Sequence, residues 1–228
     1  MTNTLQWADF IAMDYVFPEY VAGARVLDVG FGHGEQMLNL LARGCDAIGV
    51  EYNPALARAG RFKGLNVCLA SAERLPFRTA SMDGLVCKVV VPYTDEAVAI
   101  GEIARVLKPN AVARVSYQGL GYSLRYLLRG PDWKKRVYAV RVIANTAGYR
   151  LTGRRLPRWL GDTLYQSTPA LRRYYARSGL ELVKEHPSRT YAGAPVFMYH
   201  TLRRVATASQ VMDPAGDAVA PTRRRVAV

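Results

Sequence analysis

Short apolar runs recur along the first half of the chain, and stretches with helical spacing of apolar residues separate them. The runs are typical of buried strands and occupy residues 25–28, 47–51, 65–69, 84–91 and 111–117. The helical stretches are expected at 5–15 and 34–43, from Pro54, and from Thr94 to just before Pro109. Strands that alternate with helices predict β-α-β units and a parallel sheet, so the fold class is α/β.

The alternation ends after Tyr117. Residues 119–160 are predicted to be helical, and an apolar stripe along the middle of this segment is expected to pack on the core. A helix capped by Thr168 and ended by Gly179 follows, and strands are expected at 180–183 and 196–202. The stripe consists of Trp133, Val137, Val140 and Ala144.

Residues 1–205 are therefore predicted to form a single domain, in which 119–160 is an insertion after the fifth strand. Residues 206–228 contain mainly small residues before Arg223, Arg224 and Arg225, and a disordered basic tail is expected there.

The charge of the chain is strongly positive: 31 Lys and Arg residues against 18 Asp and Glu residues give a formal net charge of +13. Ten of the basic residues lie in 119–160, where Asp132 is the single acid. Such a surface suggests anionic partners, namely nucleic acid, phosphorylated metabolites or a membrane face, although arginine-rich coding would also produce it.

Other compositional features narrow the class of protein. No apolar run is long enough to span a bilayer, and the N-terminus lacks a signal-peptide pattern, so a cytoplasmic location is expected, with membrane association left open. Three isolated cysteines are interpreted as reduced thiols, and three scattered histidines give no metal-binding spacing.

The stretch VLDVGFGHGEQML, residues 26–38, is the main candidate for chemistry. It places Asp28 and three alternating glycines at a strand-to-helix junction, where a doubly wound sheet binds its ligands. Glu51 ends the next strand, at the separation expected of a carboxylate that binds a ribose. Together these residues predict a nucleoside-containing ligand.

The spacing favours one nucleoside over another. A nicotinamide cofactor would favour a third glycine at position 35, where this chain has Glu35, and a carboxylate there would repel a pyrophosphate. S-adenosyl-L-methionine has no phosphate and carries a positive sulfonium and amino group, so acids near the loop suit it.

Four stretches in order resemble the class I S-adenosylmethionine-dependent methyltransferases, specifically the UbiE-like, methyltransferase type 11 group. The resemblance covers residues 20–118 and, more loosely, 168–204. It implies a Rossmann-like, doubly wound sheet of about seven strands, mostly parallel with the last strand antiparallel, and a helical insertion after strand five. The stretches are VLDVGFGHG (26–34), GVEYNP (49–54), SAERLPF (71–77) and EIARVLKP (102–109).

The resemblance also implies roles for individual residues. The glycine loop would approach the methionine and ribose, Glu51 would hold the ribose, and Tyr52 would pack on the adenine. Two departures are visible: Ser71 stands where many relatives have Asp, and the polar pair often found near Val91 and Pro92 is absent. The residues expected at the cofactor are Asp28, Gly30, Phe31, Gly32, Gly34, Glu51, Tyr52, Ser71, Ala72, Glu73 and Lys88.

The function implied is methyl transfer to a small-molecule or lipid-like, anionic acceptor, with oxygen favoured, and 119–160 as the lid or acceptor site. A general base is needed only if the acceptor must lose a proton, and Tyr93, Tyr117 and His200 are the candidates. Two alternatives stay open: an RNA methyltransferase that uses the basic, aromatic insertion, and a non-catalytic, cofactor-binding partner subunit. A small or lipid-linked acceptor is preferred over nucleic acid, and peripheral membrane contact remains an expectation.

Overall fold

The structure is a computed structural model, and it describes residues 20–154, 156–157, 163–186 and 188–206. The helix expected at 5–15 lies outside the described residues. So does the expected basic tail, apart from Ala206.

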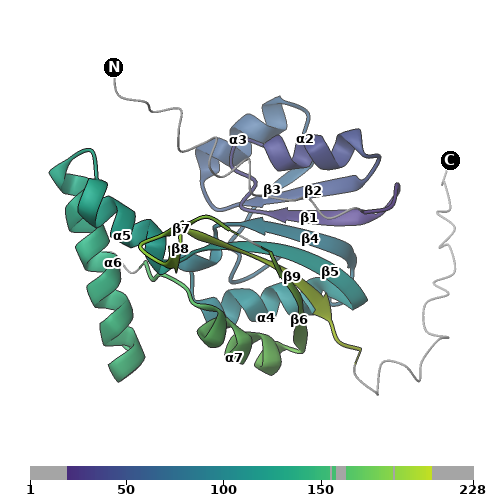
Figure 1. Cartoon of the computed structure of the whole chain (residues 1–228). Helices are drawn as coiled ribbons and strands as arrows, with labels where there is room; N and C mark the ends of the chain where they lie inside the picture. Colours follow the sequence, from purple (N-terminus) through teal and green to yellow (C-terminus); the bar gives the residue numbers. More distant parts are fainter. Residues whose placement is uncertain (1–19, 155, 158–162, 187, 207–228) are drawn as a thin grey trace, which may run out of the picture.

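A seven-stranded sheet forms the centre of the molecule, in the order β3-β2-β1-β4-β5-β9-β6 (Figure 1). Neighbouring strands from β3 to β5 are parallel, whereas β9 pairs antiparallel with both β5 and β6. The predicted sheet of about seven strands with an antiparallel last strand is confirmed. The strands are β1 (Arg25–Val29), β2 (Asp46–Glu51), β3 (Val67–Leu69), β4 (Met82–Lys88), β5 (Leu107–Gln118), β6 (Leu180–His186) and β9 (Phe197–Arg204).

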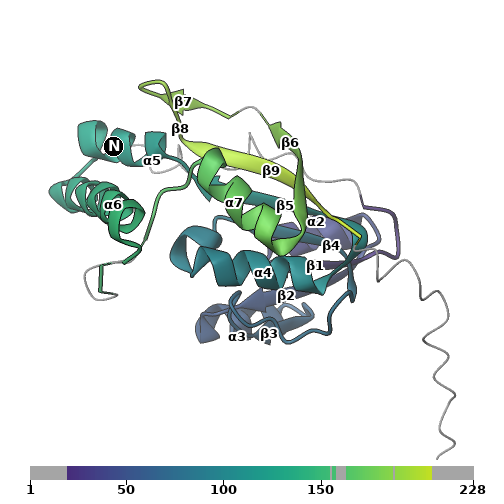
Figure 2. The ribbon, with the colours of Figure 1, turned by 90° about the horizontal axis from the view of Figure 1, so that it is seen from below.

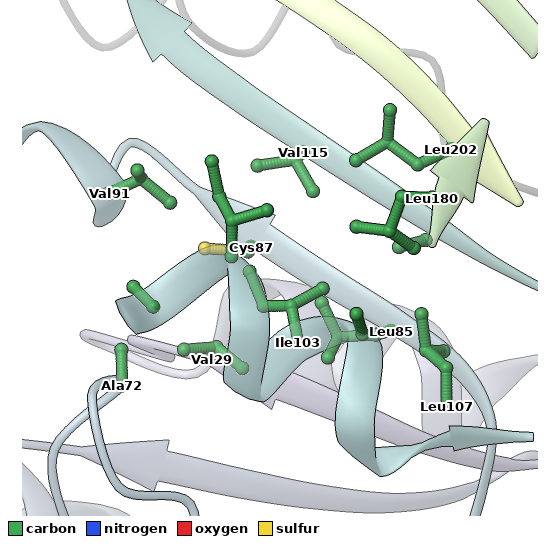
Figure 3. Packing of buried hydrophobic residues seen from close by; sticks show 14 of the residues in the cluster. Val29, Ala72, Leu85, Cys87, Val91, Ile103, Leu107, Val115, Leu180 and Leu202 are labelled. Carbon is green, nitrogen blue, oxygen red and sulfur yellow. The ribbon is translucent and has the colours of Figure 1, made fainter. Parts of the chain in front are cut away.

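Helices cover both faces of this sheet (Figures 1 and 2). Because successive strand residues point to opposite faces, Val26 packs in the core beneath α2, whereas Leu27 packs in the core beneath α4. Figure 3 shows the second of these cores, where Ile103 of α4 lies among residues of the central strands. One face carries α2 (Glu35–Ala42) and α3 (Pro54–Phe62), and the other carries α4 (Glu96–Val106) and α7 (Thr168–Ser178).

Two helix caps differ from those expected. The side chain of Asp95, not that of Thr94, caps α4 by accepting hydrogen bonds from the backbone N–H groups of Ala97 (3.0 Å) and Val98 (3.2 Å). The cap position of α7 is Ser167, and the hydroxyl of Thr168 donates instead to Glu185 (2.7 Å). A carboxylate thus replaces the predicted threonine cap only at α4, whereas at α7 the helix begins one residue earlier than predicted and Ser167, in the cap position, makes no side-chain capping hydrogen bond.

Strand boundaries also shift. β4 ends at Lys88, not at residue 91, because Val89 has a positive φ of 57° and turns the chain out of the sheet. A 3₁₀ turn over Val91–Tyr93 follows. β3 begins at Val67 instead of Leu65, and β5 begins directly after α4, so the predicted strand at 111–117 is longer than expected.

The insertion after β5 is helical, as predicted, and folds as a pair of contacting helices, α5 (Leu120–Arg129) and α6 (Trp133–Thr152). The pair projects past the ends of the strands, on the side where β5 ends (Figure 1). α5 contacts a small unpredicted ribbon made of β7 (Thr190–Tyr191) and β8 (Ala194–Pro195). None of the described helices is both long and apolar enough to cross a membrane.

The predicted packing face of α6 is wrong. The expected stripe is exposed, with exposed fractions of 69% for Trp133, 46% for Val137 and 52% for Val140. The buried positions are Ala139, Val142, Asn145 and Thr146.

Hydrogen bonding explains which face of α6 turns inward. Asn145 accepts a hydrogen bond from the backbone of Leu156 (2.8 Å) and donates one to that of Thr163 (3.2 Å), and the Thr146 hydroxyl accepts one from the backbone of Tyr165 (3.0 Å). Buried backbone groups must be paired, so the face that can pair them packs inward and the apolar stripe stays outside.

Candidate functional site

The three glycines that follow β1 are required for different structural reasons. All three have positive φ, 72° at Gly30, 55° at Gly32 and 91° at Gly34. A Cβ atom at Gly30 would clash with the side chain of Val90, and one at Gly34 would lie 2.7 Å from Leu65 Cδ1. Gly32 differs, because no heavy atom lies within 4 Å of the position where its Cβ would be. Gly32 therefore leaves room for a ligand against the backbone.

Glu51 ties the end of β2 to this loop. Its Oε2 accepts a hydrogen bond from the backbone N–H of Gly32 (3.1 Å), and its Oε1 accepts one from that of Asn53 (2.9 Å). A carboxylate has about four lone-pair sites, so two further donors can bind. The side chain is thus held in one orientation and can still accept hydrogen bonds from vicinal hydroxyl groups.

A cavity of about 490 Å³ opens where β1, β2 and β4 end. Its volume lies in the range of small-molecule and cofactor sites. Seven of the eleven residues expected at the cofactor line it: Gly30, Glu51, Tyr52, Ser71, Ala72, Glu73 and Lys88. The structure therefore brings together residues from three separate predicted motifs.

The other four expected residues do not line the cavity. Gly32 and Gly34 shape the loop beside the cavity. Asp28 is buried and immediately precedes Val29, which lines the cavity. Phe31 is only 4% exposed, and its ring fills the space left by Gly49 and Gly60 in the core. Phe31 thus supports the loop from the protein side and does not face the cavity.

The cavity also contains residues that sequence reasoning missed, chiefly Val89, Val90 and Thr94. Val89 is unusual, because a β-branched residue with a positive φ is a steric outlier, and such outliers cluster at functional sites. No sequence signal marks it, since valine is the residue least expected in that conformation.

Asp28 is the most strongly perturbed acid at the site. It is 1% exposed, and no described residue donates a hydrogen bond to either of its carboxylate oxygens. Burial raises its pKa to about 7; the charge of Lys88 opposes this rise and that of Glu51 adds to it. Burial lowers the pKa of Lys88 in turn. An unsatisfied buried carboxylate beside the cavity fits a ligand that carries positively charged nitrogen or sulfur.

The three candidate bases differ in their position relative to the cavity. Tyr93 lines the cavity, and its hydroxyl oxygen accepts a hydrogen bond from Gln118 Nε2 (3.0 Å). Tyr117 and His200 are fully buried and are joined through Tyr175, whose hydroxyl lies 2.8 Å from the Tyr117 oxygen and 2.8 Å from His200 Nδ1. Neither lines the cavity, so the structure corrects the expectation that either acts directly on an acceptor.

Comparisons with known proteins agree with this geometry. A family model described as "Methyltransferase domain" matches residues 27–115. An uncharacterized methyltransferase of Mycobacterium tuberculosis is 34% identical over 101 residues, which are 43% of this chain and 41% of that protein. A ubiquinone biosynthesis O-methyltransferase of Xanthomonas oryzae is 32% identical over 109 residues, 44% of this chain and 46% of that protein. The chain thus spans less than half the length of these two relatives.

The fold is shared more widely than the sequence. An S-adenosylmethionine-dependent methyltransferase from Mesorhizobium loti superimposes with a TM-score of 0.60 at 17% identity, over 87% of this chain and 97% of that one. At this identity the likeness is one of fold. It extends to most of the chain, beyond the segment that the family model matches.

Proposed function

We propose, from the premise that residues 27–115 form a class I S-adenosylmethionine-dependent methyltransferase domain, that this chain methylates a small-molecule or lipid-like, anionic acceptor. The observation that carries the proposal is the fixed Glu51 carboxylate at the mouth of the glycine loop, with the unsatisfied Asp28 beside the same cavity.

Each part of the cofactor has a matching set of residues. Glu51 would accept hydrogen bonds from the two ribose hydroxyls. The Asp28 carboxylate would lie toward the positive amino group of the methionine part, and the Lys88 ammonium would lie toward its carboxylate. The adenine would lie against Tyr52, Ser71, Ala72 and Glu73, which line one part of the cavity.

When bound, the cofactor would supply a methyl group on a positive sulfur: the acceptor oxygen would bond to the methyl carbon as the carbon–sulfur bond breaks, and its electron pair would stay on the sulfur of neutral S-adenosylhomocysteine. The protein's own task is to hold the acceptor in line and to exclude water. Tyr93 can contribute to this positioning, because it lines the cavity and Gln118 fixes its hydroxyl. No acid–base pair is required if the acceptor oxygen is already deprotonated.

Oxygen is our favoured target atom, and the name of the Xanthomonas relative supports it. The basic insertion supports an anionic acceptor, since Asp132 is the only acid in 119–160. We propose a cytoplasmic protein with peripheral membrane contact when the acceptor is lipid-linked. An RNA acceptor would instead give RNA binding that weakens steeply with salt.

Calorimetry with S-adenosylhomocysteine tests the proposal. We expect Glu51→Gln to weaken binding by about 10- to 100-fold, because hydrogen bonds to a charged group contribute about 1.5–3 kcal/mol. The matched control is Glu181→Gln, which removes an exposed carboxylate paired with Arg203 and should leave binding unchanged. Failure of the wild-type chain to bind, or unaltered binding by Glu51→Gln, would contradict the proposal.

A further inference from the structure

A second cavity of about 440 Å³ adjoins the first through Tyr93, which lines both. The insertion builds the rest of it, from α5, α6 and the residue before α6. We call it the tyrosine pocket, and it is lined by Tyr93, Tyr122, Tyr126, Asp132, Lys134, Lys135 and Tyr138.

The tyrosine rings stand at right angles to one another. The rings of Tyr122 and Tyr126 meet edge to face, with centroids 4.9 Å apart and an interplanar angle of 84°. Those of Tyr126 and Tyr138 are 6.5 Å apart at 89°. Walls of this kind offer both ring faces and ring edges, which are the preferred contacts of another aromatic ring.

The tyrosine hydroxyls contribute hydrogen bonds without charge. Burial raises the pKa of Tyr122 and of Tyr138 well above the usual value, so both phenols stay protonated at neutral pH. The Tyr122 hydroxyl donates to that of Tyr126 at 3.4 Å. The charge of the pocket therefore comes from its lysines and Asp132.

The charge balance favours an anion. Lys134 and Lys135 face a single acid, Asp132, whose Oδ1 already accepts a hydrogen bond from the Lys135 backbone at 2.8 Å. Asp132 is also the only acid among the described residues of the insertion. Cages of aromatic residues commonly bind cations, but here Lys135 Nζ itself lies 5.4 Å above the Tyr126 ring. A cationic ligand would therefore meet like charge.

These lysines are costly to the helix that carries them. Lys134 and Lys135 lie in the first turn of α6, where the helix dipole disfavours positive charge. The helix terminus itself gains nothing from cations at this position, and both lysines line the pocket, where Lys135 contacts the Tyr126 ring.

From this geometry we infer that the tyrosine pocket binds the methyl acceptor and selects a planar aromatic acid. The ring lies among the tyrosines, and the carboxylate lies beside Lys134 and Lys135. This inference rests on the proposed function, because Tyr93 connects the pocket to the cavity assigned to the cofactor.

Four probes added to the full chain saturated with S-adenosylhomocysteine test the inference by calorimetry. 4-Hydroxybenzoate, 4-hydroxybenzamide and tyramine share a phenol ring and differ in charge, and cyclohexanecarboxylate keeps the acid without the aromatic ring. We expect 4-hydroxybenzoate to bind at least tenfold more tightly than each of the others. Equal or tighter binding of tyramine or cyclohexanecarboxylate, or no binding of any probe, would overturn the inference.

Variants locate the site and separate the two proposals. The double change Lys134→Gln and Lys135→Gln should weaken 4-hydroxybenzoate about tenfold and leave S-adenosylhomocysteine and 4-hydroxybenzamide unchanged. Lys184→Gln, on the exposed part of β6, is the matched control and should bind as wild type. Unaltered 4-hydroxybenzoate binding by the double variant would refute the pocket alone, whereas failure to bind S-adenosylhomocysteine would refute the proposed function.

Discussion

At Gly32, the effect of a substitution on ligand binding can be separated from its effect on the stability of the fold. Gly64 has a similarly positive φ, 75° against 55°, and also has no heavy atom within 4 Å of its Cβ position. Gly64 follows the C-cap residue of α3, away from the cavity, whereas the backbone N–H of Gly32 donates to Glu51, which lines the cavity. The two glycines are therefore a matched pair that differ in their distance from the proposed cofactor.

We expect Gly32→Ala and Gly64→Ala to lower the free energy of unfolding by a similar amount, about 1–2 kcal/mol each, because both force alanine into a left-handed conformation. Only Gly32→Ala should weaken S-adenosylhomocysteine, by tenfold or more, because the new methyl group occupies the space beside the loop. Denaturant titration and calorimetry measure the two effects. Equal affinity of the two variants would mean that the ligand does not approach Gly32.

Asp28 gives the second prediction at the scale of residues. Its pKa is raised to about 7 in the folded chain, above the ordinary value of 3.8, so the unfolded chain releases the proton first as pH rises. The buried acid therefore supports folding below about pH 4 and opposes it increasingly between pH 4 and pH 7.

Asp28→Asn should accordingly stabilise the ligand-free protein above pH 7, by roughly 1–4 kcal/mol, and have little effect near pH 4. The measurement is the free energy of unfolding as a function of pH. Asp83→Asn is the control of opposite sign, since Lys108 and the Arg25 backbone hydrogen-bond to Asp83 and hold its pKa below the usual range. An increase in the free energy of unfolding of Asp28→Asn that is the same at every pH would contradict this account.

At the scale of elements, α6 shows how far an apolar pattern can be trusted. Its stripe has helical spacing and predicted a helix correctly, but it did not identify the buried face. Period alone cannot tell whether a stripe meets the core or the solvent. Here the backbone groups of Leu156, Thr163 and Tyr165 decided the matter by pairing with the side chains of Asn145 and Thr146, 11 to 19 residues away in sequence.

Two valines on α6 test this orientation. Val142 is 4% exposed and Val140 is 52% exposed, so Val142→Ala should cost about 2 kcal/mol of unfolding free energy, whereas Val140→Ala should change it by less than about 0.5 kcal/mol. Both substitutions place the better helix former at a helical position, so the difference isolates packing. A larger loss for Val140→Ala would restore the orientation predicted from the stripe.

For the whole molecule, most of the sheet and part of the site were predictable, and for the same reason. The alternation of strands and helices predicts a parallel sheet, and parallel strands bring their carboxyl ends to the same side of the sheet, so Gly30 and Glu51 were expected to meet there. The turn at Val89 was not predictable, because valine rarely adopts a positive φ and no residue type in the sequence indicates one there. Nor was the tyrosine pocket, because it depends on how the insertion folds back on Tyr93.

The buried contact between Tyr117, Tyr175 and His200 joins β5, α7 and β9, and it links the stability of the whole fold to pH. Burial lowers the pKa of His200 to about 4, with Arg172 and His186 acting in the same direction and Glu185 opposing them. The unfolded chain therefore takes up a proton near pH 6.5, where the folded chain does not. Stability from this group is complete above pH 6.5 and is lost as pH falls toward 4.

We therefore expect wild-type protein to lose unfolding free energy between pH 6.5 and pH 4, and His200→Gln to lose less over the same interval, because glutamine takes up no proton in the unfolded chain. The exposed His33 supplies the control, since His33→Gln should retain the wild-type slope. Denaturant titrations at closely spaced pH values measure all three slopes. If His200→Gln and wild type had the same slope, acid sensitivity would have to come from carboxylates such as Asp83, and the buried histidine would be only a packing residue.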